Sequence, residues 1–481
     1  MTTRFAPIWS GRQIQGRGGR VDQVTGADFL QLDPAGVPPG GLAAWLTGAL
    51  RDAVADGRLA VGARVPASRT LATQLGVSRG VVVEAYQRLT DEGLLSARSG
   101  GGTRVSAVPG AVRRLGAATR LPTPELDLSP GVPDLSAFPR AAWAKASREV
   151  LAEVGSADLG YGDPRGVPVL REALAVWLGR TRGLTVSPDE ILVVNGVAQG
   201  LVLLARWLEE RGRTTVGFEE PGSYGGRVHL QRWGMTTVPV PVDGDGLDVA
   251  ALGASGVDAV VVTPAHQFPT GVVLSPQRRR ELVEWVRAAP DRLLIEDDYD
   301  AEHRYDRPPV AAVKVLAPDR VVHLGSVSKT LAPAMRIGWL IAPSGMHEEL
   351  VEARYWLDLA SPALPQITLA RMLTSGAFER HLRLVRPRHK ARRDALLEAL
   401  AEHLPAARVR GVAAGLHVLA TLPDGIDDTA VAEAALEAGI AVHPLSRHRQ
   451  GTGPPGLVIG YAATTPDRLR EAVRRLAPLI S

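Results

Sequence analysis

A single lysine at the end of an apolar stretch is the residue in this sequence best suited to covalent chemistry. Lys329 lies in the segment SVSKTLAPAMRIGW (326–339), directly after the apolar run 321–324. The chain has 55 Lys plus Arg, yet lysine occurs only at positions 145, 314, 329 and 390. A primary amine can condense with a carbonyl group once burial lowers its pKa, whereas a guanidinium cannot. Taken alone, Lys329 could equally be a surface lysine at a strand end.

A second segment ends in carboxylates and a tyrosine. Residues 293–299 read LLIEDDY, an apolar strand pattern that leads into Asp297 and Tyr299. Because these residues are two positions apart, both side chains can project the same way. Pyridoxal phosphate needs an anionic partner for its ring nitrogen and a donor for its 3′ oxygen, and these roles suit Asp297 and Tyr299. The acidic run 296–298 alone also fits a strand-end turn or a magnesium site.

Two loops could complete a site for a phosphorylated ligand. The segment NGVAQG (195–200) is a glycine turn that opens a helix, and the N–H groups at such a helix start can bind phosphate. The segment TPAHQFPTG (263–271) is a polar loop at the C-terminal end of another strand, where ligands gather in open α/β sheets. Taken alone, the turn also fits plain packing, and a lone histidine such as His266 is more often structural.

Apolar strands alternate with helical patterns from about residue 126 to the end of the chain. We expect strands at 191–195, 215–219, 259–263, 293–296 and 321–324, and helices that include 200–211 and 277–288. This alternation predicts an α/β domain with a mainly parallel sheet over residues 126–481. Residues 107–125 are rich in Ala, Arg and Pro without an apolar period, which predicts a linker after a first domain over 1–106, with its core at about 30–106.

The first domain has the pattern of a helix-turn-helix. Apolar residues spaced by four over 42–54 predict an amphipathic helix. Ser68 is expected to cap a second helix over 69–75, and Ser78 a longer one that begins at residue 79. The second helix of such a motif presents its first side chains to the major groove of DNA. A small helical bundle without a DNA role would have the same pattern.

A glycine-rich hairpin follows the two helices. Residues 96–105 read SARSGGGTRV, in which short strands flank a tip of three glycines. This is the expected wing, with Arg98 and Arg104 available to phosphates or to the minor groove. Residues 1–108 hold twelve Arg and no Lys against eight acidic residues, which accounts for the whole net charge of +4. A basic small domain beside a neutral large one suits a polyanion-binding role.

Bulk composition narrows the class of protein further. Hydrophobic residues make up 45% of the chain and charged residues 22%, the profile of a globular protein. The chain has no cysteine, which excludes disulfides, cysteine-ligated zinc and a cysteine nucleophile. The first twenty residues lack the apolar core of a secretory signal, and no apolar run reaches the length of a membrane span. We therefore expect a cytoplasmic protein without membrane contact.

The N-terminal domain resembles the GntR family of winged-helix regulators. The resemblance rests on LxxGxRVPxSR (59–69), LAxxLGVSR (71–79), AYxxL (85–89), EGL (92–94) and the pair GT at 102–103. It implies binding to double-stranded operator DNA. The DNA-contacting residues that we expect are Arg64, Ser68, Arg69, Ser78, Arg79, Gly80, Arg98, Gly101 and Thr103.

The large domain resembles fold-type I pyridoxal-phosphate enzymes of the class I aminotransferase group. The strings are EEPG (219–222), PAHQFPTG (264–271), EDDYD (296–300) and SxSKTLxPxxRxG (326–338). The resemblance implies that Lys329 carries pyridoxal phosphate as a Schiff base, that Asp297 pairs with the pyridinium and that Tyr299 meets the 3′ oxygen. The expected cofactor contacts are Val197, Ala198, Gln199, Tyr224, His266, Asp297, Tyr299, Ser326, Ser328, Lys329 and Arg336, with no metal.

Together the two domains are similar to the MocR/GabR subfamily of GntR regulators, which implies a domain-swapped, head-to-tail homodimer. The sequence departs from the family where an aromatic residue often follows Pro-Gly: here Ser223 comes first and Tyr224 second. Val197 and Ala198 also stand where polar residues are common. Arg447 aligns best with the arginine that would clamp an effector carboxylate.

These observations predict a transcription regulator that senses pyridoxal phosphate, or an amine or amino-acid adduct of it, through an aminotransferase-like domain. One alternative is a working aminotransferase that carries a DNA-binding domain, with at least weak transamination. Another is a repressor whose large domain has lost its cofactor.

Overall fold

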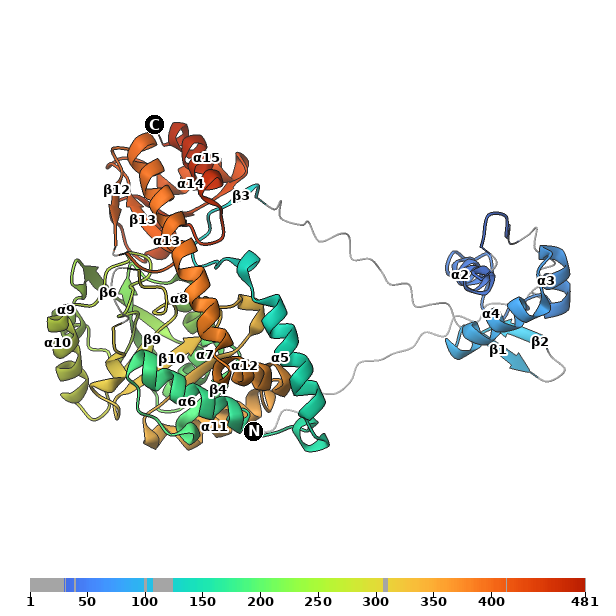
Figure 1. Cartoon of the computed structure of the whole chain (residues 1–481), viewed down its shortest axis with the longest axis horizontal. Helices are drawn as coiled ribbons and strands as arrows, with labels where there is room; N and C mark the ends of the chain where they lie inside the picture. Colours follow the sequence, from blue (N-terminus) through green and yellow to red (C-terminus); the bar gives the residue numbers. More distant parts are fainter. Residues whose placement is uncertain are drawn as a thin grey trace, which may run out of the picture. The chain divides into compact units, whose positions relative to one another are not determined.

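The computed structural model describes residue 30 and residues 32–38, 40–98, 102–106, 124–305, 310–411 and 413–480. The chain forms two compact units, Met1–Leu121 and Pro122–Ser481 (Figure 1). Residues 107–123 of the predicted linker lie outside the described residues, and so does Gly101, a predicted DNA contact.

The described part of the first unit is a helix-turn-helix followed by a hairpin. Its elements are α2 (Leu42–Ala55), α3 (Ser68–Leu75), α4 (Arg79–Asp91), β1 (Leu95–Arg98) and β2 (Gly102–Val105). Ser78 caps α4 as predicted, because its Oγ accepts the N–H of Val81 at 3.4 Å. The predicted cap at Ser68 is wrong: α3 begins at Ser68 itself, and its Oγ instead accepts from Nε of Arg79 at 3.5 Å.

The apolar faces of these elements meet in one small core. Leu46 and Leu50 of α2 pack with Leu71 of α3 and with Val82 and Leu89 of α4, all almost fully buried. The spacing of four that predicted α2 places these leucines on a single face of the helix. The core fixes the start of α4 relative to α3, which is the part of the motif that faces DNA in helix-turn-helix proteins.

The second unit is built on an eight-stranded, mostly parallel sheet. Its strands, in spatial order, are β4 (Ile191–Val194), β11 (Gly338–Ile341), β10 (Val321–Ser326), β9 (Leu293–Asp297), β8 (Ala259–Val262), β5 (Thr215–Glu220), β6 (Thr236–Asp243) and β7 (Gly246–Leu247). Neighbours from β10 to β6 pair in parallel, and β11 and β7 run antiparallel to their neighbours. The predicted α/β class is confirmed, and the five predicted strands are β4, β5, β8, β9 and β10.

Helices cover both faces of this sheet. They are α5 (Arg140–Glu153), α6 (Pro168–Arg182), α7 (Val197–Glu209), α8 (Tyr224–Arg232), α9 (Val249–Ala254), α10 (Pro276–Arg287), α11 (Ser344–Asp358), α12 (Ala363–Thr374) and α13 (Ala377–His403). In β4, Ile191 and Val193 belong to one apolar core, and Leu192 and Val194 belong to another. Strands buried on both faces in this way read as continuous apolar runs, which is how the sequence showed them.

A smaller antiparallel sheet follows α13. It holds β12 (Arg408–Arg410), β13 (His417–Thr421), β16 (Gly456–Gly460) and β15 (His443–Pro444), with α14 (Asp428–Glu437), α15 (Pro466–Leu476) and the short parallel pair β3 (Leu126–Asp127) and β14 (Ile440–Ala441). The long helix α13 runs beside both layers (Figure 1), because Phe378 packs in a core of the large sheet and Leu396 in that of the small one. In the described part of the chain, no helix is both long and apolar enough to cross a membrane.

We expect Leu71→Ala to destabilise the first unit alone. Leu71 is fully buried, and truncating a buried leucine costs about 2–5 kcal/mol. In scanning calorimetry of the full chain, the thermal transition of the first unit should move to a lower temperature, and the transition of the large unit should keep its temperature. Val61→Ala, at a half-exposed valine of the same unit, is the control and should move neither transition. A shift of the large unit's transition by Leu71→Ala would contradict the separate core described above.

Candidate cofactor site and nucleic-acid interface

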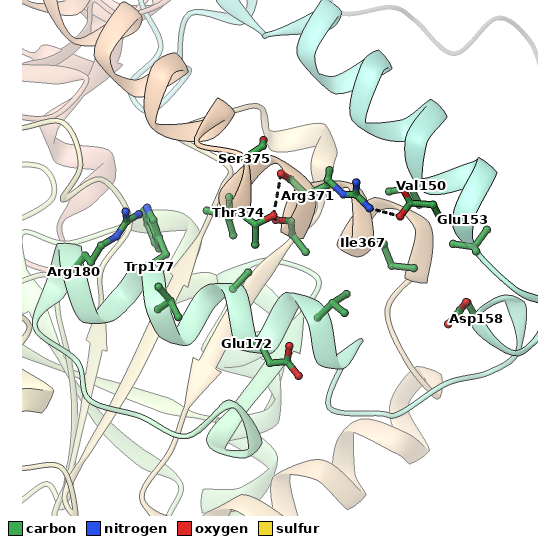
Figure 2. Close-up of a pocket in the computed structure, with 16 residues that line it drawn as sticks. Val150, Glu153, Asp158, Glu172, Trp177, Arg180, Ile367, Arg371, Thr374 and Ser375 are labelled. Atoms are coloured by element: carbon green, nitrogen blue, oxygen red, sulfur yellow. Dashed lines mark hydrogen bonds and ion pairs between the residues drawn. The ribbon is translucent and has the colours of Figure 1, made fainter.

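Among the described residues of the large unit, the cavity that carries the predicted chemistry is smaller than another one. The larger, of about 920 Å³, lies among α5, α6 and α12 (Figure 2). Its walls are mainly apolar, and a charged residue at its edge, Arg371, is paired with Glu153. It contains neither Lys329 nor the acidic strand end, so size does not identify the site.

The second cavity, of about 510 Å³, lies where strands of the large sheet end. Asp297 is the last residue of β9 and Ser326 the last of β10, and these two strands pair in parallel, so their carboxyl ends lie at the same edge. Ten predicted site residues line this cavity: Val197, Ala198, Tyr224, Asp297, Tyr299, Ser326, Ser328, Lys329, Arg336 and Arg447. The carboxyl edge of a parallel sheet is the usual place for a ligand in such folds.

Lys329 reaches into this cavity from the turn after β10. Its Nζ donates a hydrogen bond to the carbonyl oxygen of Gly131 at 2.6 Å. Burial lowers the pKa of Lys329, while the acidic groups of Asp300 and Asp297 act in the opposite direction. A lowered pKa raises the fraction of neutral amine, which is the form that attacks a carbonyl carbon.

One oxygen of Asp297, Oδ1, is buried and has no hydrogen-bond partner among the residues that the structure describes. Burial, reinforced by the neighbouring Asp298, raises the pKa of Asp297 to about 7. A buried carboxylate without a partner is costly, and a cationic N–H donor would relieve that cost. The protonated ring nitrogen of pyridoxal phosphate is such a donor, so the acid fits this cofactor.

The opposite end of the cavity suits a phosphate group. Helix α7 starts at Val197 after Gly196, whose backbone has a positive φ of 82°. A side chain at that glycine would put a Cβ 3.1 Å from Nη1 of Arg336, so the guanidinium lies against the helix start. Ser326 and Ser328 line the same region. Helix N–H groups, hydroxyls and a guanidinium together form an anion site.

Two predicted contacts do not reach the cavity. Gln199 turns back instead: its Oε1 accepts the N–H of Asn195 at 2.7 Å and its Nε2 donates to Asp358 at 2.8 Å. His266 lies behind Tyr299 and is 2% exposed. Each side chain is held by protein partners, and the prediction that they touch the ligand stays a prediction.

The structure adds wall residues that the sequence reasoning missed. His443 and His448 flank Arg447 at the outer end of the cavity, and Gly131 and Phe268 complete the inner wall. Burial lowers the pKa of His448 to about 3 and that of His443 to about 4, so both rings are neutral at pH 7. Their closeness in sequence to Arg447 was the available signal.

The acidic run 296–298 does not form a common metal site. The carboxylate of Glu296 accepts the backbone N–H groups of Val313 and Lys314 at 2.8 and 3.1 Å. Asp298 forms a buried two-point ion pair with Arg182 at 2.5 and 2.7 Å. Glu296 and Asp298 are thus occupied by separate protein partners, and the described residues hold no cluster of three metal-ligating side chains, which argues against the magnesium alternative.

The predicted DNA contacts of the first unit gather at the start of α4 and beside the hairpin. Ser78, Arg79 and Gly80 are exposed, and Arg69 is exposed on α3. Arg64 is exposed and forms an isolated bridge with Arg104 of β2. Thr103 lies partly exposed in β2 and Arg98 ends β1. These positions give one basic module with a helix start for the groove and a hairpin beside it.

Comparison with known proteins decides the family. Residues 123–476 match the family described as aminotransferase class I and II, and residues 43–105 match the bacterial regulatory proteins of the gntR family. The HTH-type pyridoxine biosynthesis transcriptional regulator PdxR of Corynebacterium glutamicum is 37% identical over 442 residues, which cover 91% of this chain and 95% of that protein. This chain belongs to the MocR/GabR subfamily of GntR transcription regulators.

Further relatives of this MocR/GabR-type regulator match one or both units. A probable rhizopine catabolism regulatory protein MocR of Rhizobium meliloti is 31% identical and covers 89% of this chain and 91% of that protein. The crystal structure of LysN, an alpha-aminoadipate aminotransferase of Thermus thermophilus complexed with N-(5′-phosphopyridoxyl)-L-leucine, is 27% identical with a TM-score of 0.67, covering 74% of this chain and 92% of that one. The predicted fold and family resemblance are thereby confirmed.

In this MocR/GabR-type regulator, Tyr224 is the aromatic residue at the position where the sequence departs from its family. It opens α8, lines the cavity and lies under the guanidinium of Arg447, 4.8 Å from the ring centre. Its backbone N–H donates to Nδ1 of His448 at 3.4 Å. Tyr224 and Arg447 therefore share the outer wall of the cavity.

We expect Asp297→Asn to stabilise the cofactor-free protein at high pH and to weaken cofactor binding. The raised pKa of Asp297 means that folding favours its protonated form, so its contribution is present near pH 4 and lost as pH rises through about 7. Each unit of pKa shift corresponds to about 1.4 kcal/mol. Thermal unfolding of the cofactor-free protein at pH 5 and pH 8 should show a smaller loss of stability in Asp297→Asn than in the wild type.

Burial also raises the pKa values of Glu219 and Glu302. Both acids are present in the wild type and in the variant, so a difference in pH dependence between the two proteins reports on Asp297. Equal pH dependence in the two proteins would show that Asp297 is not the buried acid that governs this region.

Proposed function

We propose that this regulator binds pyridoxal 5′-phosphate in the cavity of its large unit and senses the cofactor itself, or an amine or amino-acid adduct of it, to control operator binding by its first unit. The observation that carries the proposal is the meeting of the unpaired Oδ1 of Asp297 and the amine of Lys329 in one cavity. Both belong to a chain whose first unit is a winged helix-turn-helix.

Each end of the cavity would hold a different part of the cofactor. Lys329 provides the amine for its aldehyde, Asp297 the anionic partner for its ring nitrogen, and Tyr299 a hydroxyl for its 3′ oxygen. The phosphate would be held by the start of α7, with Val197 and Ala198 contributing backbone N–H groups, and by Ser326, Ser328 and Arg336. When bound, the cofactor supplies an electron sink that stabilises negative charge on an attached amine substrate.

The outer end of the cavity is proposed to receive the effector. Arg447 offers a cation for an effector carboxylate, and Tyr224 offers an aromatic face beside it. An effector amine would have to compete with the amine of Lys329. Binding can shift the population of the DNA-binding state only to the extent that the effector prefers one state of the protein.

DNA recognition is proposed for the residues of the first unit that the sequence singled out. Ser78, Arg79 and Gly80 would face base edges in the major groove, while Arg64, Ser68, Arg69, Arg98, Gly101 and Thr103 would contact the backbone or the minor groove. We also propose a domain-swapped, head-to-tail homodimer in the cytoplasm, with residues 107–125 as the linker between domains 1–106 and 126–481. The family resemblance supports this arrangement.

A working aminotransferase is the second candidate function. It is favoured by the complete set of Lys329, Asp297 and Tyr299 and by the likeness to LysN. Sustained turnover of amino-acid and keto-acid pairs at ordinary enzyme rates, together with no selective DNA binding, would favour the enzyme over the regulator. A colourless protein that does not change on adding pyridoxal phosphate would contradict both.

We expect Lys329→Ala to lose covalent attachment of the cofactor. Borohydride reduction of the loaded wild type should leave a pyridoxyl group on Lys329, which peptide mass spectrometry locates. Lys145→Ala removes an exposed lysine and is the matched control, so it should keep both the label and the visible absorbance. A Lys329→Ala protein that kept both would contradict the role given to this amine.

We expect Arg79→Ala to weaken selective DNA binding without unfolding the first unit. A side chain that reads a base edge contributes about 1–3 kcal/mol, so affinity for a duplex selected from a random-sequence pool should fall roughly 5- to 150-fold. Arg51→Ala is the control, since Arg51 is paired with Glu92 at the other end of α4. Fluorescence anisotropy of the full chain measures both, and equal losses would contradict the assignment of the α4 start.

A further inference from the structure

A buried trio lies behind the wall of the cofactor cavity. Nδ1 of His266 is 3.0 Å from the hydroxyl oxygen of Tyr299 and 2.8 Å from Oδ2 of Asp300. His266 and Asp300 are each 2% exposed, whereas Tyr299 lines the cavity. Nδ1 of His266 is thus within hydrogen-bonding distance of both a carboxylate and a phenol. Whether Nδ1 carries a proton decides whether the phenol can donate a hydrogen bond to it.

Asp300 is the charged member of the trio. Burial acts to raise the pKa of Asp300, but the contact with His266, together with the nearby His417 and His303, lowers it, and the pKa stays below its ordinary value. The neighbouring His417 and His303 are neutral at pH 7, because burial lowers their pKa values to about 3 and about 4. Among the described residues, Oδ1 of Asp300 has no hydrogen-bond partner, and Oδ2 lies 2.8 Å from Nδ1 of His266.

The anion fixes the proton on His266. A lone pair on Nδ1 facing a carboxylate oxygen at 2.8 Å would be repulsive, so Nδ1 carries a hydrogen that it donates to Asp300. This holds whether or not the other ring nitrogen is protonated. Nδ1 therefore cannot accept a hydrogen bond from Tyr299, and the phenol oxygen can only share the Nδ1 proton as a second acceptor.

The backbone holds the pair in place. Gly415 has a positive φ of 73°, and a Cβ there would lie 2.0 Å from Cε1 of His266 and 2.8 Å from Oδ2 of Asp300. The main chain just before β13 therefore packs directly on both side chains, and only glycine allows this approach. Both side chains are buried, so their hydrogen bond lies in a medium of low dielectric.

We propose that Asp300 and His266 are a positioning pair that turns the hydroxyl proton of Tyr299 toward the cavity, so that the site offers a donor to an anionic phenolate oxygen of its ligand. Asp300 also acts on the Tyr299 hydroxyl and, with burial, raises the pKa of this phenol, so the phenol keeps its proton. The contact of the hydroxyl oxygen at 3.0 Å is with Nδ1 of His266, which already carries a hydrogen, so the proton has the cavity and Asp300 as its two directions, and the shared Nδ1 proton favours the cavity. The inference rests on the proposed cofactor, and it converts His266 from a predicted ligand contact into a residue that acts through Tyr299.

The test uses pyridoxine 5′-phosphate, which lacks an aldehyde and cannot bond to Lys329. Its ultraviolet absorbance reports ionisation of its phenol when bound. Tyr299→Phe should raise the pH midpoint of that ionisation by about one to two units, because it removes a hydrogen bond to a charged oxygen. In the Asp300→Asn background the same substitution should raise the midpoint by less than half as much, since the amide no longer compels His266 to donate.

This double-mutant cycle separates positioning from simple charge. The charge of Asp300 also acts directly on the ionisation of the bound phenol. Asp300→Asn removes this direct effect both from the protein with Tyr299 and from the Tyr299→Phe protein, so the direct effect cancels when the two shifts are compared. The other groups near the trio, Asp297, Lys329, His303 and His417, are the same in all four proteins. Equal effects of Tyr299→Phe in both backgrounds would overturn the proposal. A larger effect in the Asp300→Asn background would show that the Tyr299 proton goes to Asp300 instead.

A measurement without any change to the pair covers the case in which Asp300→Asn does not fold. NMR of isotope-labelled histidine in the unsubstituted full chain reports which ring nitrogens carry hydrogen, and His266→Gln identifies the signal. We expect Nδ1 of His266 to be protonated, and an unprotonated Nδ1 would overturn the proposal. Failure of the wild type to bind pyridoxine 5′-phosphate would count against the proposed cofactor, while the NMR result would still decide the positioning pair.

Discussion

The cost of taking a carboxyl group out of water governs the arrangement of the large unit. Strand β9 ends in consecutive acids, and the fold satisfies them in different ways. Glu296 accepts backbone N–H groups and Asp298 binds Arg182, but Asp297 keeps an oxygen without a partner inside the cavity. Charged groups left in this state are destabilising unless a ligand completes them. The same feature that costs stability in the empty protein therefore becomes binding energy for a cationic ring nitrogen.

Few charges act inside the cavity, although many titratable side chains surround it. Burial lowers the pKa values of His303, His417, His443 and His448 far enough to leave the rings neutral. The charges at the site thus come from the cations Lys329, Arg336 and Arg447 and from the acids of segment 297–300. The imidazoles contribute shape and hydrogen-bond direction, which are set by their neighbours.

The sequence predicted the elements and most wall residues, because both follow from local pattern. Apolar runs gave strands within two residues of their observed ends, and ten predicted residues share one cavity since they follow neighbouring strands. Gln199 and His266 are not among the residues that line this cavity, because the direction of a side chain depends on partners distant in sequence, here Asp358 and Asp300. Gly131 and His443 were missed because only the tertiary fold brings them beside β9 and β10.

The near-absence of lysine has a consequence for how the chain meets reactive aldehydes in general. Lys314 is buried and donates to two carbonyl oxygens, so Lys145 and Lys390 are the side-chain amines left on the surface. Reducing sugars, simple monoaldehydes and acylating agents modify proteins mainly through exposed amines, and arginine does not substitute for lysine in that chemistry. A chain that carries most of its positive charge as guanidinium exposes few amines to such reagents. Imine formation is then confined largely to Lys329, the lysine that lines a cavity.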